Sequence, residues 1–281
     1  MEVFRSLGSV RSYIKKCRLS GESIGFVPTM GCLHQGHLSL VEKSNLQDNR
    51  TIASIFINPL QFVKGEDFER YPRTESEDLE RLSHSGVDMV FLPEESMIYP
   101  AGKVLTIAEG KISKILCGFH RPGHFDGVLQ VVLKLLNLVQ CDRIYLGQKD
   151  YQQWLLIKLM VEELFLETEV IPCPIIRESD GLAMSSRNRY LSESQRCLAA
   201  QFPKLLKKFH DYSGSTSTAS AEEFIFKDLQ KKGFEVDYVR ILNSRDLSDS
   251  EDFSIPGNLR ILGAVRLGKT RLIDNMAWGE Q

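Results

Sequence analysis

The chain has 281 residues, of which 42% are hydrophobic and 26% are charged, and its formal net charge is −2. This length allows one large domain or two smaller ones, and the composition excludes a largely disordered chain. Because the charges nearly balance, the chain as a whole has no electrostatic reason to bind nucleic acid or an anionic membrane. Any affinity for anions must be local.

The chain shows no pattern typical of a membrane or secreted protein. Residues 1–21 contain no uninterrupted apolar core of the kind that a secretory signal needs. The longest apolar run, from Val128 to Val139, is interrupted by polar residues and is shorter than the roughly 20 residues of a membrane span. Because the six cysteines are widely spaced, we expect reduced thiols in a cytoplasmic protein.

Short apolar runs alternate with helical patterns over the first part of the chain. The expected strands are 23–27, 51–57, 87–92, 143–146 and 168–176, and the expected helices are 75–85, 125–139 and 151–164. This order predicts an α/β fold with a parallel sheet covered by helices on both faces. In such sheets, ligands bind at the carboxyl ends of the strands.

The pattern changes after about residue 176, where we expect a smaller α+β unit. A helical segment over 193–210 is followed by a Ser/Thr-rich loop over 213–220. Ser220 and Glu223 form a possible capping box for a helix that closes at Gly233. The expected strands of this unit are 235–242, 259–267 and 270–275.

The first segment with chemical potential follows the strand that ends at Pro28. Gly31 and Gly36 permit a tight turn, and a helix can begin near His37. The pattern predicts free backbone N–H groups at the positive end of a helix dipole, which suits a phosphate. His34 and His37 are three residues apart and can converge on one group, although ordinary turn glycines and incidental histidines are an equally good interpretation.

Neutral amides follow the strand expected at 51–57. Asn58 and Gln61 can hydrogen-bond the hydroxyl and carboxylate groups of a small acid without adding charge. Asn58-Pro59 is also a common turn signal, and on its own the segment favours that plainer interpretation.

Two further segments offer groups for a polyphosphate. Lys149 stands at the end of the strand expected at 143–146, next to a helix for which Asp150 can simply be the N-cap. Gln153, one helical turn further, can face the same crevice as Gln61. Residues 185–187 (Ser-Ser-Arg) add two hydroxyls and a guanidinium. Four such segments together predict a site for a nucleoside triphosphate beside a small polar acid.

A zinc site is the competing interpretation of the histidines and cysteines. Two sets have spacings that resemble those of metal ligands, namely Cys32, His34 and His37, and Cys117, His120 and His124. Arg121 and Pro122 lie inside the second set. A cationic Arg beside a divalent ion is unfavourable, so we favour the phosphate interpretation.

The motifs PTMGCLHQGH, FINPLQF with GEDFERYPRT, RPGHFDGV, GQKDYQQ and DGLAMSSRNRYL resemble those of the pantothenate synthetases (pantoate–β-alanine ligases), a family of the H-x-G-H nucleotidyltransferase superfamily. The resemblance runs from about residue 23 to 191 and resumes at RLIDNM. It implies a Rossmann-like domain of residues 1–175 that binds ATP and pantoate. It also implies a smaller α+β domain of residues 176–281 that covers the active site, and a homodimer.

The resemblance implies a reaction in two steps, as part of pantothenate and coenzyme A biosynthesis. ATP and pantoate give enzyme-bound pantoyl adenylate and pyrophosphate, and β-alanine then captures the pantoyl group to give pantothenate and AMP. Mg²⁺ is expected with ATP, and the acidic stretch 75–78 is one suggestion for its ligands.

The site residues follow from the same resemblance and from the chemistry above. We expect His37, His34 and Lys149 to be catalytic. The expected ATP site consists of Met30, Gly31, Cys32, Leu33, His34, Gln35, Gly36, His37, Gly147, Gln148, Lys149, Asp150, Ile176, Met184, Ser185, Ser186 and Arg187. The expected site for pantoate and β-alanine consists of Pro28, Thr29, Asn58, Gln61 and Gln153.

Three other functions stay open at this point. One is a non-catalytic nucleotide sensor, against which Lys149 and His37 argue. An adenylyltransferase that releases its nucleotidyl product would share the histidine motif and the fold. A zinc-dependent hydrolase would use the Cys/His sets instead.

Overall fold

The computed structural model describes residues 1–101, 105–211 and 217–279, and the chain forms two compact units. Unit 1 comprises Met1–Gln148 and Gln152–Pro174. Unit 2 comprises Lys149–Tyr151 and Ile175–Gln281, so a three-residue segment in the middle of the chain belongs to the C-terminal unit.

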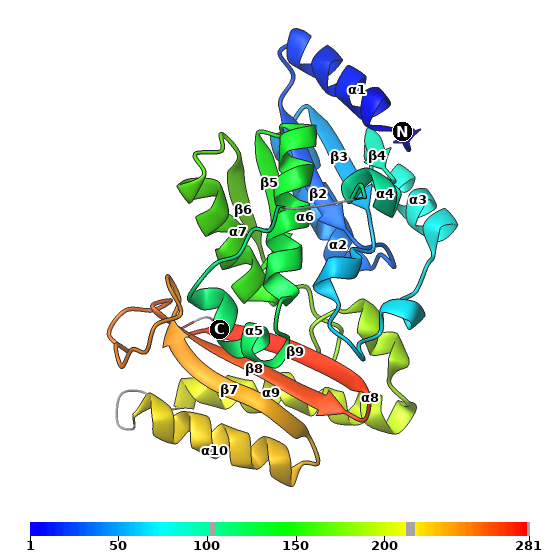
Figure 1. Ribbon diagram of the computed structural model, residues 1–281. Helices are drawn as coiled ribbons and strands as arrows, with labels where there is room; N and C mark the ends of the chain where they lie inside the picture. Colours follow the sequence, from blue (N-terminus) through cyan, green and yellow to red (C-terminus); the bar gives the residue numbers. More distant parts are fainter. Residues whose placement is uncertain (102–104, 212–216, 280–281) are drawn as a thin grey trace. The chain divides into compact units, whose positions relative to one another are not determined.

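Unit 1 is built on a six-stranded parallel sheet with the order β1-β4-β3-β2-β5-β6 (Figure 1). The strands are β1 (Glu2–Phe4), β2 (Ile24–Thr29), β3 (Arg50–Ile55), β4 (Met89–Phe91), β5 (Arg143–Gly147) and β6 (Glu169–Cys173). The chain leaves β2 toward β3 and β4 on one side, and β5 and β6 extend the sheet on the other. The carboxyl ends of β3, β2 and β5 are therefore neighbours, at the topological switch point where such sheets bind ligands.

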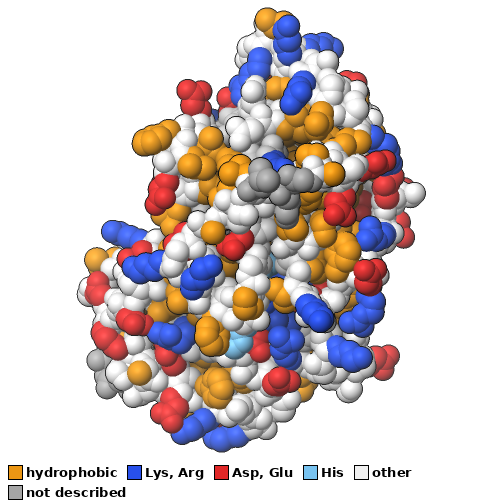
Figure 2. Space-filling view, viewed as in Figure 1, with side chains coloured by type: hydrophobic (Ala, Val, Ile, Leu, Met, Phe, Trp, Pro, Cys, Tyr) orange, Lys and Arg blue, Asp and Glu red, His pale blue; other side chains and the backbone are white. Residues whose placement is uncertain are grey.

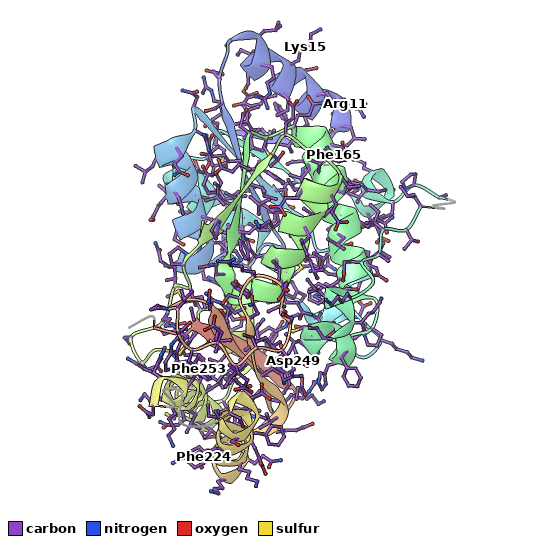
Figure 3. The ribbon with its side chains drawn as sticks, turned by 90° about the vertical axis from the view of Figure 1, so that its left-hand side faces the viewer. Arg11, Lys15, Phe165, Phe224, Asp249 and Phe253 are labelled. Carbon is purple, nitrogen blue, oxygen red and sulfur yellow. The ribbon has the colours of Figure 1, made fainter. Side chains whose placement is uncertain are left out.

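Helices cover both faces of this sheet. They are α1 (Leu7–Leu19), α2 (Gln35–Gln47), α3 (Glu75–His84), α4 (Glu95–Ile98), α5 (Leu116–His120), α6 (His124–Val139) and α7 (Tyr151–Glu163). α2 packs on β2, β3 and β5, whereas α1 packs on α6. Figure 3 shows α2 and α6 on opposite sides of the sheet.

The helices of unit 1 are oriented by amphipathic sequence. In α1, Val10, Ile14 and Cys17 are buried, while Arg11 and Lys15 are exposed on its outer side (Figure 3). Apolar residues three or four positions apart form one stripe of a helix, so burying this stripe fixes which side of α1 faces the protein.

Unit 2 contains an antiparallel sheet with the order β7-β8-β9, and helices lie against one face of it (Figure 1). Its elements are α8 (Glu193–Ala199), α9 (Gln201–Lys207), α10 (Thr218–Lys231), β7 (Glu235–Asn243), β8 (Leu259–Leu267) and β9 (Thr270–Ala277). Phe202 and Leu206 of α9 pack over Gly263 of β8, where an added Cβ would lie only 3.0–3.1 Å from their side chains. A glycine here lets the helix approach the sheet closely.

The predicted α/β fold, a Rossmann-like parallel sheet with helices on both faces plus a smaller α+β unit, is confirmed. The sequence analysis missed β1 and α1, since β1 has only three residues and α1 is mostly polar. The strand expected at 168–176 ends at Cys173, before Pro174, which has no N–H to donate to a sheet.

Two helical predictions for unit 2 were also wrong in detail. The helix expected over 193–210 is interrupted at Ala200, because Pro203 has no N–H to donate to the Ala199 carbonyl and is tolerated only in a new first turn. The capping box expected at Ser220 is absent from the described α10. Ser217 caps this helix and accepts a hydrogen bond from the Ser220 amide. Of the expected loop over 213–220, residues 213–216 lie outside the described residues.

The mixed surface charges and the free thiols agree with what the composition predicts. Figure 2 shows Lys and Arg side chains interspersed with Asp and Glu over the visible face. All six cysteines are free thiols, as predicted. Within the described ranges, the helices are too short or too polar to cross a membrane.

We expect Leu206→Ala to lower the free energy of unfolding of unit 2 by about 2–5 kcal/mol, because it leaves a cavity in a fully buried site. Trp278 of unit 2 packs on Phe209 and reports on this core. Chemical denaturation followed by Trp278 fluorescence, in a Trp154→Phe background, measures the change. Leu46→Ala, at a site 86% exposed, is the matched control and should change stability by less than about 0.5 kcal/mol. Equal stabilities for the two variants would contradict the assigned core.

Candidate active site

Two consecutive residues of the loop after β2 have a left-handed backbone conformation, just before α2 begins. Gly31 has φ 79° and Cys32 has φ 51°. A Cβ on Gly31 would lie 2.9 Å from a carboxylate oxygen of Asp78, so both its backbone conformation and its surroundings require glycine. Cys32 adopts the same conformation without being glycine, and its side chain is only 1% exposed.

The backbone amides of this loop already have acceptors inside the protein. Gly31 N–H donates to Thr29 Oγ1 (3.2 Å), and the amides of Cys32 and Leu33 donate to the two oxygens of Asp78 (2.8 Å each). The amides of residues 34 and 36 donate to imidazole nitrogens. The prediction of free backbone N–H groups for a phosphate was therefore wrong for these five amides.

The two histidines of the motif cap α2 reciprocally. His34 is the N-cap, and its Nδ1 accepts the Gly36 amide (3.1 Å), while Nδ1 of His37 accepts the His34 amide (3.3 Å). A neutral imidazole carries one proton, so a ring whose Nδ1 accepts must carry that proton on Nε2. The ring centroids lie 4.1 Å apart. The pair thus presents two Nε2–H donors at the N-terminus of α2, the end of the helix that favours anions.

Asp78 holds the loop that precedes these histidines. This residue of α3 is 2% exposed, and its Oδ2 also accepts a hydrogen bond from the Thr74 hydroxyl (3.1 Å). Arg81, one turn further along α3, donates to the Leu33 carbonyl (3.2 Å). The suggestion that residues 75–78 bind Mg²⁺ does not fit Asp78, whose two oxygens are directed at backbone amides.

Asn58 and Gln61 lie together at the end of β3, as predicted. Asn58 Nδ2 donates to Gln61 Oε1 (3.2 Å), and Gln61 Nε2 lies 2.7 Å from Sδ of Met30, which follows β2. Asn58 is buried, and its Oδ1 accepts a hydrogen bond from the Tyr99 hydroxyl (2.8 Å). Pro28 and Thr29 form the end of β2 itself. Asn58 and Gln61 therefore contact each other at the end of β3, and Gln61 also contacts Met30, which follows Pro28 and Thr29.

Gln153 and the residues after β5 lie on the segment that leads from β5 into α7. Gly147 ends β5, and Gln148–Asp150 form a short 3-10 helix, η4, before α7. Gln153 is half-buried in α7, and its expected role beside Gln61 stays a prediction.

The predicted ATP residues of unit 2 form a turn of their own. The Met184 amide donates to the Ile176 carbonyl (2.9 Å), which places these two residues side by side. Ser185 caps the 3-10 helix η5 (Ser186–Tyr190), and its Oγ accepts the Arg187 amide (3.3 Å). Ser186 is 8% exposed. Ser185, Ser186 and Arg187 thus lie together on one capped turn.

Lys149 is held by residues that the sequence analysis did not identify. Its backbone carbonyl accepts a hydrogen bond from Asn275 Nδ2 (3.0 Å), and Asn275 is 2% exposed in β9. Arg260 donates to the Asn275 side chain, and its guanidinium lies 4.1 Å from the ring centroid of Tyr151. The lysine expected to be catalytic is therefore fixed to the sheet of unit 2, and the only signal in the sequence was the RLIDNM motif.

A buried ion pair supports the same strand. Arg177 donates to both oxygens of Asp274 (2.7 and 3.0 Å). Burial raises the pKa of Asp274, against the opposing effect of Arg177. The pair ties the start of unit 2 to β9.

The two zinc sets of the sequence analysis do not form a metal centre. Within the residues that the structure describes, no three His, Cys, Asp or Glu side chains are grouped so that they could hold a metal ion. His124 contacts Arg121 through one ring nitrogen and the Gln61 carbonyl through the other.

The geometry defines a class of protein: an α/β protein with two histidines and a pair of neutral amides at the switch point of a parallel sheet, where such folds bind ligands. The sequence profile of the family described as "Pantoate-beta-alanine ligase" matches residues 2–277. The chain therefore belongs to the pantoate–β-alanine ligase family.

Relatives and solved structures agree over the whole chain. The chain is 45% identical over 282 residues to the pantothenate synthetase of Caldicellulosiruptor bescii, covering 98% of each. It is 44% identical over 283 residues to that of Aquifex aeolicus, covering 97% of each. The crystal structure of pantothenate synthetase from Thermus thermophilus matches with a TM-score of 0.91 and 39% identity, covering 98% of this chain and 99% of that chain.

A further match is to a protein solved with ligands. It is the pantoate–β-alanine ligase of Francisella tularensis "Complexed with Beta-gamma ATP and Beta-alanine". The TM-score is 0.84 and the identity 36%, covering 99% of this chain and 97% of that chain.

We expect Asp78→Asn to lower kcat/KM for ATP by roughly 10–100-fold. The asparagine keeps the size of the side chain but places an N–H group against a backbone N–H, and a hydrogen bond to a charged group contributes about 1.5–3 kcal/mol. Steady-state kinetics with varied ATP measures the change. Glu77→Gln, at the exposed neighbouring position, is the control and should resemble the parent. A folded Asp78→Asn protein with parental kcat/KM would contradict the role of Asp78.

Proposed function

We propose that this ligase makes pantothenate in two steps, with pantoate bound at the ends of β2 and β3. In the first step a pantoate carboxylate oxygen attacks the α-phosphorus of ATP, the bond to the bridging oxygen breaks, and pyrophosphate leaves. In the second step the amine of β-alanine attacks the acyl carbon of pantoyl adenylate, AMP leaves, and the amine loses its extra proton. The observation that carries this proposal is the reciprocal cap of α2, in which Nδ1 of His34 and Nδ1 of His37 each accept a backbone amide.

His34 and His37 stabilise the phosphate oxygens during the first step. The attack brings two anions together, so the enzyme must supply donors where charge accumulates on phosphorus. Each ring offers an Nε2–H because its Nδ1 accepts a backbone amide. In this role both histidines act as neutral hydrogen-bond donors, and His37 stabilises the crowded phosphorus of the transition state.

Lys149 and the turn at residues 185–187 hold the departing pyrophosphate. A lysine serves as a compact point charge, while the two serine hydroxyls and Arg187 supply directional donors. ATP enters as its Mg²⁺ complex. The remaining ATP contacts come from Met30–His37, Gly147–Asp150, Ile176 and Met184, as the family resemblance implies.

Asn58, Gln61 and Gln153, with Pro28 and Thr29, bind pantoate and then β-alanine. Neutral amides bind hydroxyl and carboxylate groups without the strong charge attraction that would retain a product. Gln61 is already ordered by Met30 and Asn58, so less side-chain freedom is lost when substrate binds.

We further propose that the protein acts as a homodimer in the cytoplasm, in pantothenate and coenzyme A biosynthesis. We also propose two domains, residues 1–175 and 176–281. Neither proposal changes the chemistry above.

One assay tests the whole proposal and separates it from an adenylyltransferase. Purified protein is incubated with ATP, MgCl₂, pantoate and β-alanine, and each component is omitted in turn, with products followed by mass spectrometry. The ligase gives pantothenate, AMP and pyrophosphate only in the complete mixture. A released adenylate ester with no amide would overturn the proposal.

We expect His37→Ala and Lys149→Ala each to slow pantoyl adenylate formation by about 10²–10³-fold, the usual effect of removing one donor from a developing oxyanion. The measurement is the pantoate-dependent exchange of labelled pyrophosphate into ATP. His84→Ala removes an exposed histidine of α3 and should leave the exchange rate unchanged. Near-parental exchange in His37→Ala would rule out the assigned role.

We expect Gln61→Ala to raise KM for pantoate and for β-alanine by about tenfold or more, with KM for ATP changed by less than about threefold. A lost hydrogen bond to a charged substrate group contributes about 1.5–3 kcal/mol, and ATP makes no contact with this amide in our proposal. Steady-state kinetics with each substrate varied gives the three constants. Gln230→Ala, exposed on α10, is the control. Equal losses for all three substrates would indicate damage to the fold instead.

A further inference from the structure

Arg121, which follows α5, and His124, the first residue of α6, have no assigned role in the proposed reaction. The sequence analysis considered this part of the chain only as part of a family motif and of a zinc set. In the structure both side chains lie against the backbone of Gln61. Their contacts therefore concern the substrate pocket of unit 1.

His124 donates a hydrogen bond to the Gln61 carbonyl. Its Nδ1 lies 2.6 Å from that oxygen, and its Nε2 lies 2.9 Å from Nη1 of Arg121. A guanidinium has donors only, so Nε2 must accept and the ring proton must reside on Nδ1. The imidazole is 7% exposed, so this arrangement is protected from competing water.

Arg121 is held in place by a carboxylate and also reaches the same carbonyl. Its Nε and Nη2 donate to the two oxygens of Glu66 (2.5 and 2.8 Å), and Nη2 lies 3.2 Å from the Gln61 carbonyl oxygen. Glu66 in turn accepts the Val63 amide (3.1 Å). The guanidinium thus connects the loop after Gln61 to the start of α6.

The first turn of α6 packs closely against the backbone of Leu60 and Gln61. A Cβ on Gly127 would lie 2.2 Å from the Leu60 carbonyl oxygen and 2.8 Å from the Gln61 nitrogen. The Gly127 carbonyl accepts a hydrogen bond from Asn58 Nδ2 (3.0 Å). Only a glycine allows the helix to approach the 58–61 turn this closely.

We propose that Arg121 and His124 are positioning residues for the pantoate and β-alanine pocket. They fix the main chain of Gln61, and its side-chain amide is thereby held between Met30 and Asn58 in one orientation. A binding group that is ordered in advance loses little conformational freedom when substrate arrives. This inference rests on the proposed role of Gln61 and extends it to residues that do not themselves contact substrate.

Two substitutions of His124 test the hydrogen bond from its Nδ1 separately from the contact of its Nε2 with Arg121. His124→Asn places an amide N–H where Nδ1 lies and keeps the donor to the Gln61 carbonyl. His124→Gln places its amide where Nε2 lies, so it keeps a partner for Arg121 and loses that donor. We expect KM for pantoate to rise about tenfold in His124→Gln and to stay within about threefold of the parent in His124→Asn. KM for ATP should stay within about twofold in both.

Arg121→Lys tests the second contact. A lysine cannot donate to Glu66, His124 and the Gln61 carbonyl together, since it lacks the planar fork of the guanidinium. We expect KM for pantoate and for β-alanine to rise by more than about tenfold, with KM for ATP nearly unchanged. His120→Gln on α5 is the control for His124→Gln, since the type of change is the same, and it should leave all three constants at parental values.

The outcomes of these experiments distinguish a failure of this inference from a failure of the proposed function. Thermal unfolding followed by circular dichroism shows that the variants are folded before kinetics are compared. If Gln61→Ala raises KM for pantoate but His124→Gln and Arg121→Lys do not, the inference is wrong and the role of Gln61 stands. If Gln61→Ala itself has no effect on pantoate, the proposed role of Gln61 fails, and this inference fails with it. A loss shared equally by ATP and pantoate in His124→Gln would also overturn it.

Discussion

The position of the imidazoles that we assign to catalysis depends on one buried carboxylate. Asp78 accepts two consecutive amides of the loop after β2, where Cys32 is held in a left-handed conformation that side chains rarely adopt. Without this acceptor, two buried N–H groups would be unsatisfied, at about 1–3 kcal/mol each. The same loop leads directly into the reciprocal cap formed by His34 and His37, so the position of these two imidazoles depends on an interaction made by α3.

Unit 2 holds Lys149, to which we assign a role in the proposed reaction, in a similar way. Lys149 is fixed through its backbone carbonyl by Asn275, a buried side chain of β9, and the neighbouring Asp274 is fixed by Arg177. In both units the residues that we assign to the chemistry lie at a helix N-terminus or in a short 3-10 helix, and buried polar residues of neighbouring strands or helices help to hold them. Polar groups are stable at such depth only when their hydrogen bonds are satisfied, so these contacts also define one conformation.

The sequence predicted the fold and the strand-end placement well, because periodicity and chain order determine both. The runs that became β2, β3 and β5 are strongly apolar, and each is followed by polar residues or glycine. The sequence could not reveal which hydrogen bonds these residues make. Asp78 was considered as a metal ligand and His124 as a zinc ligand, because a residue type and a spacing do not specify the partner that tertiary packing supplies. Asn275 lies 126 residues from Lys149 along the chain, and only the fold brings them together.

The positions of the imidazole protons explain why the proposed role of His34 and His37 differs from that of His124. Nδ1 of His34 and of His37 accepts a backbone amide, so each ring carries its proton on Nε2 and cannot offer that nitrogen as a lone pair. His124 has the opposite tautomer, because its Nε2 faces a guanidinium and its Nδ1 faces a carbonyl. A zinc ligand needs a nitrogen lone pair directed at the metal. In all three rings the lone pair is already directed at a donor of the protein, so the hydrogen-bond geometry itself favours phosphate donors and a positioning residue over a metal centre.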